Sequence, residues 1–116
     1  MSNFVERERD LNEMILAGKA LEGFEKHYAE GVVMQENSEE PRVGKAANRA
    51  YEEQFFSSLE EVHGVELRSS GAGEQVTFSE WTFDVTFQGG ERKQLEQAVV
   101  RRWEGGQVVH ERFYHP

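Results

Sequence analysis

The sequence predicts an α+β fold in which three N-terminal helices pack on a strongly curved, mostly antiparallel sheet, forming a cone with an internal pocket. Apolar residues recur at helical spacing in the first half of the chain and alternate with period two from Val62 onward. Two glycine pairs, Gly89-Gly90 and Gly105-Gly106, separate long strands into hairpins. A chain of 116 residues without cysteine has room for one domain, 1–116, whose core forms without disulfides.

The first two helices are predicted from their ends and their apolar stripes. Asn3 followed by Glu6 is typical of a capping box, and Gly18 is typical of a helix end. The second helix covers about 20–29 and ends before Gly31. The residues at helical spacing are Phe4, Leu11, Met14 and Ile15 in the first helix and Leu21, Phe24 and Tyr28 in the second.

A short strand, a loop and a third helix follow. Val32–Glu36 is a strand-forming run, and Asn37–Pro41 is rich in loop residues. The third helix begins after Gly44. Residues four apart in it are expected to line one face: Ala47, Tyr51, Phe55 and Leu59.

The second half of the chain is predicted to be a four-stranded meander. Its strands cover Val62–Arg68, Gln75–Gln88, Glu91–Glu104 and Gln107–His115, and Ser69–Gly73 forms the first turn. Strict alternation places one set of side chains on a single face of the second strand: Ser79, Trp81, Phe83, Val85 and Phe87.

The length of these strands implies a curved sheet. A flat strand of about 13 residues spans roughly 43 Å, whereas a domain of this size has a radius of gyration of about 13 Å. The strands must therefore bend, and the helices cover the concave side. We expect a pocket wall of aromatic side chains, which suits a small, flat, apolar ligand: Tyr28, Tyr51, Phe55, Trp81, Phe83 and Phe113.

Three stretches carry a resemblance to a known family. They are Tyr28–Met34, Pro41–Lys45 and the closing hairpin Arg102–Val109 with Glu111–Tyr114 behind it. With the order of elements over nearly the whole chain, they resemble the SnoaL-like polyketide cyclase and ketosteroid isomerase group of the nuclear-transport-factor-2-like superfold. The resemblance implies a pocket for a small apolar ligand and a homodimer, but no single chemistry. Members include isomerases, cyclases, dehydratases, epoxide hydrolases and binding domains.

Glu36 is one candidate catalytic residue. It shares a strand face with Val32 and Met34, which places it at the pocket rim. A gap-free count along the resemblance puts Glu36 at the general-base aspartate of ketosteroid isomerases. The alternative is a solvated residue at the start of a Glu-rich loop. The same count puts Asn12 and Val99 where those enzymes have their hydroxyl and carboxyl donors, so ketosteroid isomerase activity itself is not expected.

Arg101 and Glu111 are the other candidate catalytic residues. Leu95, Gln97, Val99, Arg101 and Trp103 share one strand face, and an inward Trp103 brings Gln97 and Arg101 inside. A buried arginine needs a carboxylate partner, for which Glu111 and Glu36 are the alternatives. A bulge would shift the alternation and turn Arg102 inward instead. The pair either acts on a ligand carbonyl, with Gln97 or Asn12 as further oxyanion donors, or is structural.

His115 shares its strand face with Glu111 and Phe113 and is either an acid–base group or a frayed terminal residue. The histidines lack metal-ligand spacing, so we expect no metal and no cofactor.

Charge and hydropathy limit the partners. The net charge of −9 disfavours binding to nucleic acid, and no apolar stretch approaches the ~20 residues that span a bilayer. The charged start of the chain, Met1–Arg7, and the lack of cysteine favour a cytoplasmic location. We expect a homodimer through the convex sheet face, where the following residues lie: Thr82, Thr86, Ala98, Val100 and Tyr114.

Two functions fit these observations. One is a cofactor-independent isomerase, cyclase or lyase that acts on a small apolar carbonyl compound, with Glu36 or Glu111 moving the proton. The other is a non-catalytic ligand-binding or dimerisation domain of the same fold.

Overall fold

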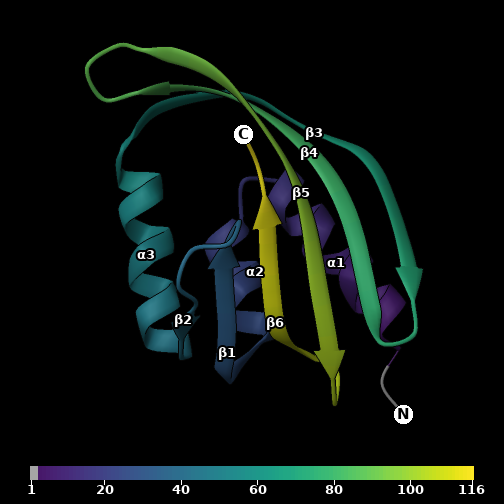
Figure 1. Cartoon of the computed structure of the whole chain (residues 1–116). Helices are drawn as coiled ribbons and strands as arrows, with labels where there is room; N and C mark the ends of the chain where they lie inside the picture. Colours follow the sequence, from purple (N-terminus) through teal and green to yellow (C-terminus); the bar gives the residue numbers. More distant parts are fainter. Residues whose placement is uncertain (1–2) are drawn as a thin grey trace.

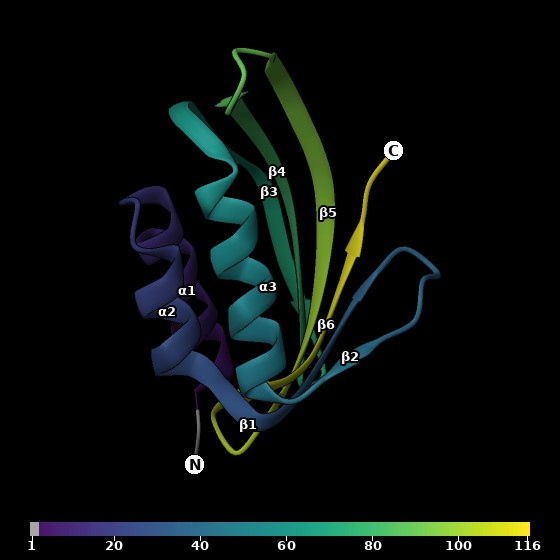
Figure 2. The same cartoon turned by 90° about the vertical axis from the view of Figure 1, so that its left-hand side faces the viewer.

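The structure, a computed structural model, describes residues 3–116, so that Met1 and Ser2 of the charged N-terminal stretch lie outside it. The helices are α1 (Phe4–Leu16), α2 (Ala20–His27) and α3 (Lys45–Ser57). The strands are β1 (Tyr28–Glu36), β2 (Arg42–Val43), β3 (Leu59–Gly73), β4 (Val76–Phe87), β5 (Arg92–Glu104) and β6 (Gln107–Tyr114). Figure 2 shows the three helices together on one side of a single sheet.

The sheet has six strands in the order β2-β1-β6-β5-β4-β3, and every neighbouring pair is antiparallel except β1 and β6. Its long strands, β3 to β5, arch over the helical side (Figure 1). Register shifts in the β3–β4 ladder, for example between Val62 and Gly64, are bulges that increase the bending. The predicted α+β architecture with a curved sheet is confirmed. The radius of gyration is 13.8 Å and the longest extent is 46 Å.

The N-terminal half follows the prediction with two shifts. Asn3 caps α1, because its Oδ1 accepts a hydrogen bond from the Glu6 N–H at 3.2 Å. Helix α2 ends at His27 rather than Ala29, and β1 begins at once with Tyr28, four residues before the predicted strand. The Tyr28 side chain is buried in the core and its backbone pairs with Val108, which favours the extended conformation there.

Helix α3 is rotated from the predicted orientation, although Phe55 and Leu59 of the predicted face are partly buried. Ala47 is exposed and Tyr51 is 41% exposed, whereas Asn48 is fully buried. The Asn48 Nδ2 group donates to the backbone carbonyls of Val32, Arg42 and Gly44 at 2.8–3.2 Å. These bonds fix the rotation of the helix, because a buried amide must keep its partners.

The first turn of the meander is also displaced. Ser69–Gly73 was predicted as a turn but continues β3 and pairs with β4 as far as Gly73 opposite Val76. The turn lies at Gln75 instead, which has a positive φ of 55° and whose carbonyl accepts the Trp103 N–H at 2.9 Å. The backbone bond to Trp103 stabilises the turn at this position.

The narrow end of the cone holds the core. Residues from α1, α2, β1, β5 and β6 meet there: Leu11, Phe24, Tyr28, Val32, Met34, Trp103 and Val108. Within residues 3–116, no helix combines the length and the apolar character needed to cross a membrane.

Candidate functional site

A cavity of about 850 Å³ lies between the helices and the concave face of the sheet. Its lining includes most of the predicted site residues: Tyr28, Glu36, Tyr51, Phe55, Trp81, Phe83, Gln97, Arg101, Glu111, Phe113 and His115. Trp81 and Phe83 stack with 5.8 Å between ring centroids and form part of the aromatic wall. The lining does not include Asn12 or Val99, which are both buried within the protein.

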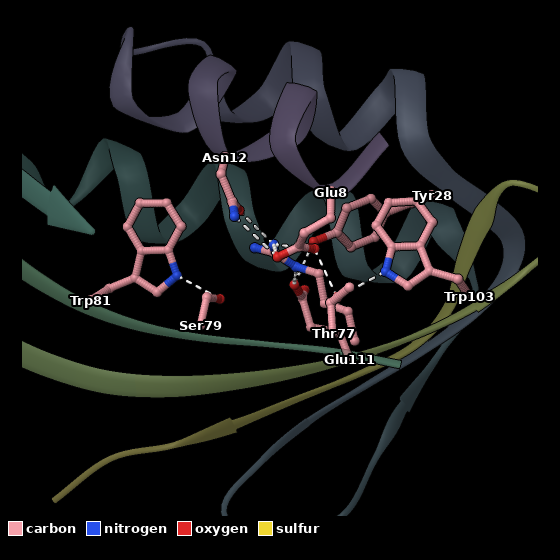
Figure 3. Close-up of polar contacts among 9 residues, drawn as sticks. Glu8, Asn12, Tyr28, Thr77, Ser79, Trp81, Trp103 and Glu111 are labelled. Atoms are coloured by element: carbon pink, nitrogen blue, oxygen red, sulfur yellow. Dashed lines mark hydrogen bonds and ion pairs between the residues drawn. The ribbon is translucent and has the colours of Figure 1, made fainter. Parts of the chain in front are cut away.

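Arg101 is the centre of a buried polar cluster in the wall of this cavity. Figure 3 shows its partners Glu8, Asn12 and Glu111 converging from α1 and the sheet. Its Nε donates to Glu111 Oε2 at 2.6 Å. Its Nη1 lies 3.0 Å from both oxygens of Glu8 and 2.8 Å from Asn12 Oδ1. Arg101 is 3% exposed while Arg102 is exposed, so the alternation that turns Arg101 inward holds.

Glu8 and Thr77 belong to this cluster and were missed in the sequence. Thr77 Oγ1 donates to Glu8 Oε1 at 2.9 Å and accepts the Trp103 Nε1–H at the same distance. Asn12 Nδ2 donates to Glu8 Oε2 at 3.0 Å. Helix α1 is therefore joined to β4 and β5 through Glu8. In the sequence, Glu8 lies three residues before Leu11 and four before Asn12. This spacing places the three on one face of the helix, which is the signal that could have identified Glu8.

Glu111 has one satisfied and one free oxygen. Oε2 accepts hydrogen bonds from Arg101 and from the Tyr28 hydroxyl, the latter at 2.5 Å. Oε1 is buried and has no hydrogen-bond partner among the described residues. Burial raises the pKa of Glu111, although Arg101 and Tyr28 oppose this by favouring the carboxylate. Burial and the charge of Glu111 raise the pKa of Tyr28 well above its usual value, so Tyr28 is a neutral donor.

Glu36 does not contact Arg101. It binds Arg42 Nη2 at 3.0 Å and lies 3.1 Å from His115 Nε2, and its side chain is 16% exposed. Arg42 in turn lies over the Tyr51 ring, 3.5 Å from its centroid. Of the two carboxylates considered for Arg101, the structure brings Glu111 to it and places Glu36 in a separate group with a different arginine.

Glu52, on α3, also lines the cavity and was missed. Burial, followed by the charges of Glu111 and Glu36, raises the pKa of Glu52 to about 8. It lies four residues after Asn48, so it shares the inward face of α3. The predicted stripe of residues four apart from Ala47 to Leu59 does not include Glu52, although most of that stripe also lines the cavity.

The arrangement suits proton exchange in a largely apolar chamber. Two carboxyl groups with raised pKa values, Glu111 and Glu52, face the same space as an arginine whose Nη2 takes part in none of its hydrogen bonds. Among the described residues, no three His, Asp or Glu side chains gather as a metal site.

Comparisons with known proteins identify solved structures that are similar to this chain over nearly its whole length. It aligns with a proposed SnoaL-like polyketide cyclase from Mesorhizobium loti at 26% identity and a TM-score of 0.85, over 97% of this chain and 99% of that one. An NTF2-like protein of unknown function from Burkholderia pseudomallei aligns at 18% identity and a TM-score of 0.84, over 100% and 92% of the two chains. AclR, a proposed hydroxylase from Streptomyces galilaeus, aligns at 19% identity and a TM-score of 0.79, over 98% and 91%.

A search of curated proteins found no match. The sequence profile of the SnoaL-like domain matches residues 9–111, which is well over half of the chain and includes every residue of the Arg101 cluster except Glu8. The chain therefore belongs to the SnoaL-like domain family.

Proposed function

We propose that the protein binds a small apolar carbonyl compound in the cavity and transfers a proton within it without a cofactor, as an isomerase, cyclase or lyase does. The observation that supports this most directly is the free Oε1 of Glu111. It is a buried carboxylate oxygen that accepts no hydrogen bond from residues 3–116, on a residue that lines a largely apolar cavity. A buried acceptor left unpaired costs stability, so a position of this kind is a candidate site of function.

In this proposal Glu111 is the base. Its carboxylate removes a proton from the carbon next to the ligand carbonyl, and the carbonyl oxygen takes the charge as an enolate. Arg101 Nη2 stabilises that oxygen, while Nε and the Tyr28 hydroxyl hold Glu111 in place. The proton returns to a different atom in an isomerisation. In a cyclisation the enolate carbon attacks a second carbonyl carbon of the same ligand, whose C=O π bond breaks and whose oxygen takes the proton from Glu111. A raised pKa brings the carboxyl group closer to the pH at which it exchanges protons efficiently.

Glu36 has a different role in this proposal. Arg42 and His115 hold it at the rim, so we assign it to shaping the entrance rather than to proton transfer. Gln97 also lines the cavity and supplies an amide that orients a polar group of the ligand.

The test is turnover of a panel of polycyclic ketones and esters by the wild type and two variants. We expect Glu111→Gln to lower kcat by at least ~100-fold, because glutamine keeps the shape but cannot take a proton. Glu36→Gln is the matched control and should retain most of the activity. Loss of activity in Glu36→Gln but not in Glu111→Gln would contradict the assignment.

A non-catalytic binding domain is the second candidate. It is favoured by the mutual satisfaction of Arg101, Glu8 and Glu111, which is also what a structural cluster requires. Tight binding of a panel compound without any turnover would support this function over the first.

We also propose a homodimer through the convex sheet face. Ala98 is exposed there, Tyr114 is 43% exposed, and the buried Thr82 Oγ1 has no partner among the described residues. Light scattering at tens of micromolar protein should give the mass of a dimer, and Tyr114→Glu should reduce it. A monomer under these conditions would exclude this interface.

A further inference from the structure

Glu52 differs from the other acidic side chains of the cavity wall that point into the fold. Glu36 is held by Arg42, and Glu111 is held by Arg101. Glu52, from the opposite layer, has no hydrogen bond or ion pair with any residue that the structure describes, yet it is partly buried and lines the cavity. A carboxyl group in an apolar wall without a protein partner is available to a ligand.

The surroundings of Glu52 determine its protonation. Glu111 on β6 and Glu36 on β1 face it with negative charge, and Arg42 on β2 and Arg101 on β5 face it with positive charge. Both arginines already bind carboxylates, so burial and repulsion prevail and the pKa of Glu52 rises to about 8. At neutral pH the group is mainly a carboxylic acid, which carries one O–H donor.

We propose that Glu52 forms a second polar subsite, which donates a hydrogen bond to an uncharged carbonyl oxygen of the ligand and excludes ligands that are anions. The subsite lies on the helical wall, whereas Arg101 and Glu111 lie on the sheet wall. It deepens the proposed function and rests on it, since both require a carbonyl ligand. The subsite selects ketones and esters over free acids.

The exclusion of anions follows from the charges around the cavity. The charge of Arg101 is already balanced by Glu8 and Glu111, and Arg42 is paired with Glu36, so among residues 3–116 neither arginine has charge left to balance a permanent ligand carboxylate, although Arg101 Nη2 remains a hydrogen-bond donor. An anionic ligand would add to the repulsion that already keeps Glu52 protonated.

The test uses four probes of similar shape and measures equilibrium binding by calorimetry. They are 2-acetylnaphthalene, which has a neutral carbonyl; 2-ethylnaphthalene, which has none; 2-naphthoate, an anion; and 2-naphthylmethylamine, a cation. At pH 6.5 the ketone should bind at least ~10-fold more tightly than the hydrocarbon, as expected for one hydrogen bond in an apolar site. Naphthoate should bind most weakly. The preference for the ketone should fall as the pH rises through 8.

Two variants at position 52 separate donation from shape. Glu52→Gln keeps an N–H donor that does not titrate, so it should retain the preference for the ketone at pH 6.5 and at pH 9.5. Glu52→Leu removes the donor and should abolish the preference at both. Glu53→Gln, at the neighbouring exposed position, is the control and should behave as the wild type. Infrared spectra of carbonyl-labelled 2-acetylnaphthalene should show a lower C=O frequency in the wild type than in Glu52→Leu.

A preference for the ketone that persists in Glu52→Leu would overturn the subsite, as would tighter binding of the amine than of the ketone. These results do not depend on turnover, so the catalytic role of Glu111 is tested separately by Glu111→Gln. Failure of every probe to bind would contradict the ligand cavity itself, and with it both proposals.

Discussion

Arg101 and Glu111 are register partners on β5 and β6, and their side chains meet on the concave side of the sheet with 2.6 Å between Nε and Oε2. Both are almost completely buried, at 3% and 1% exposure. The register of the hairpin therefore places the cation beside the carboxylate. Glu8 from α1 completes the group and joins the helical layer to the sheet.

Removing the cation should be strongly destabilising. Arg101→Met leaves Glu8 and Glu111 buried without a counter-charge, for which we expect a loss of about 3–5 kcal/mol in the free energy of unfolding. Urea denaturation measures this. Arg102→Met is the control, because Arg102 is the exposed neighbour on the same strand, and it should change stability by less than about 0.5 kcal/mol. If Arg101→Met and Arg102→Met lose the same free energy of unfolding, the ion pairs of the buried cluster do not stabilise the fold.

Tyr28→Phe tests the second donor to Glu111. The variant loses one hydrogen bond to a charged group, so stability should fall by about 1.5–3 kcal/mol in urea denaturation. The hydrogen bond from Tyr28 lowers the pKa of Glu111, so its loss should raise that pKa further. If Glu111 is the base, the acidic limb of the pH–rate profile should move to higher pH in Tyr28→Phe. An unchanged acidic limb would show that Tyr28 does not influence the proton transfer.

The sheet side of the site was predictable because strands expose side chains with a strict period of two. Once Trp103 was placed inside, Arg101 and Gln97 had to follow, and the structure has them on the cavity wall. The β5–β6 ladder does contain a register shift, but its extra residue, Val109, lies on β6, so β5 keeps its alternation and Arg101 stays inside. The sequence left Glu36 and Glu111 as alternative ion-pair partners of Arg101. Only the register of β5 and β6, which the structure supplies, decides between them.

The helical side was less predictable because its inward residues are polar. Glu8 stands between two arginines, and Asn48 and Glu52 lie beside the apolar stripe of α3 on the side that turns inward. Hydrophobic periodicity locates a helical face only when apolar residues occupy it. Here the inward rotation of α3 depends on the hydrogen bonds of Asn48 to the carbonyls of Gly44 and Arg42 just before the helix and of Val32 on β1, which the sequence alone does not show.

The stability of the protein should depend on pH through Glu52. Its pKa rises from an ordinary value of 4.5 to about 8 on folding, so between these values the folded protein holds a proton that the unfolded chain has released. The contribution of Glu52 to the free energy of unfolding therefore decreases as the pH rises from 4.5 to 8, whereas His27 and His110, whose pKa values are lowered by burial, contribute in the opposite direction. Because one pKa unit corresponds to about 1.4 kcal/mol, the decrease is on the order of a few kcal/mol.

Glu52→Gln should remove this contribution. The variant should be more stable than the wild type at pH 8, and its stability should depend less on pH between 5 and 8, as measured by urea denaturation at several pH values. Glu53→Gln is the control and should keep the wild-type dependence. The same pH dependence in the wild type and in Glu52→Gln would contradict the burial of a protonated Glu52.

His115 should control the exchange of ligand rather than the stability of the fold. Its Nε2 lies 3.1 Å from Glu36 Oε1, its backbone N–H donates to Asn37 Oδ1 at 3.0 Å, and its side chain lines the cavity. The His115 side chain is 32% exposed, and partly exposed pairs of this kind contribute about 1 kcal/mol or less. His115→Ala should therefore leave the midpoint of urea denaturation almost unchanged. It removes a side chain from the rim, so the dissociation rate of 2-acetylnaphthalene in stopped-flow measurements should increase several-fold.

His63→Ala is the control, since His63 is exposed on β3 and lies outside the cavity lining. If both variants release the probe at the wild-type rate, the ligand does not pass His115, and the entrance must lie at another part of the cavity wall, for example beside Leu59 and Val62 at the far end of α3.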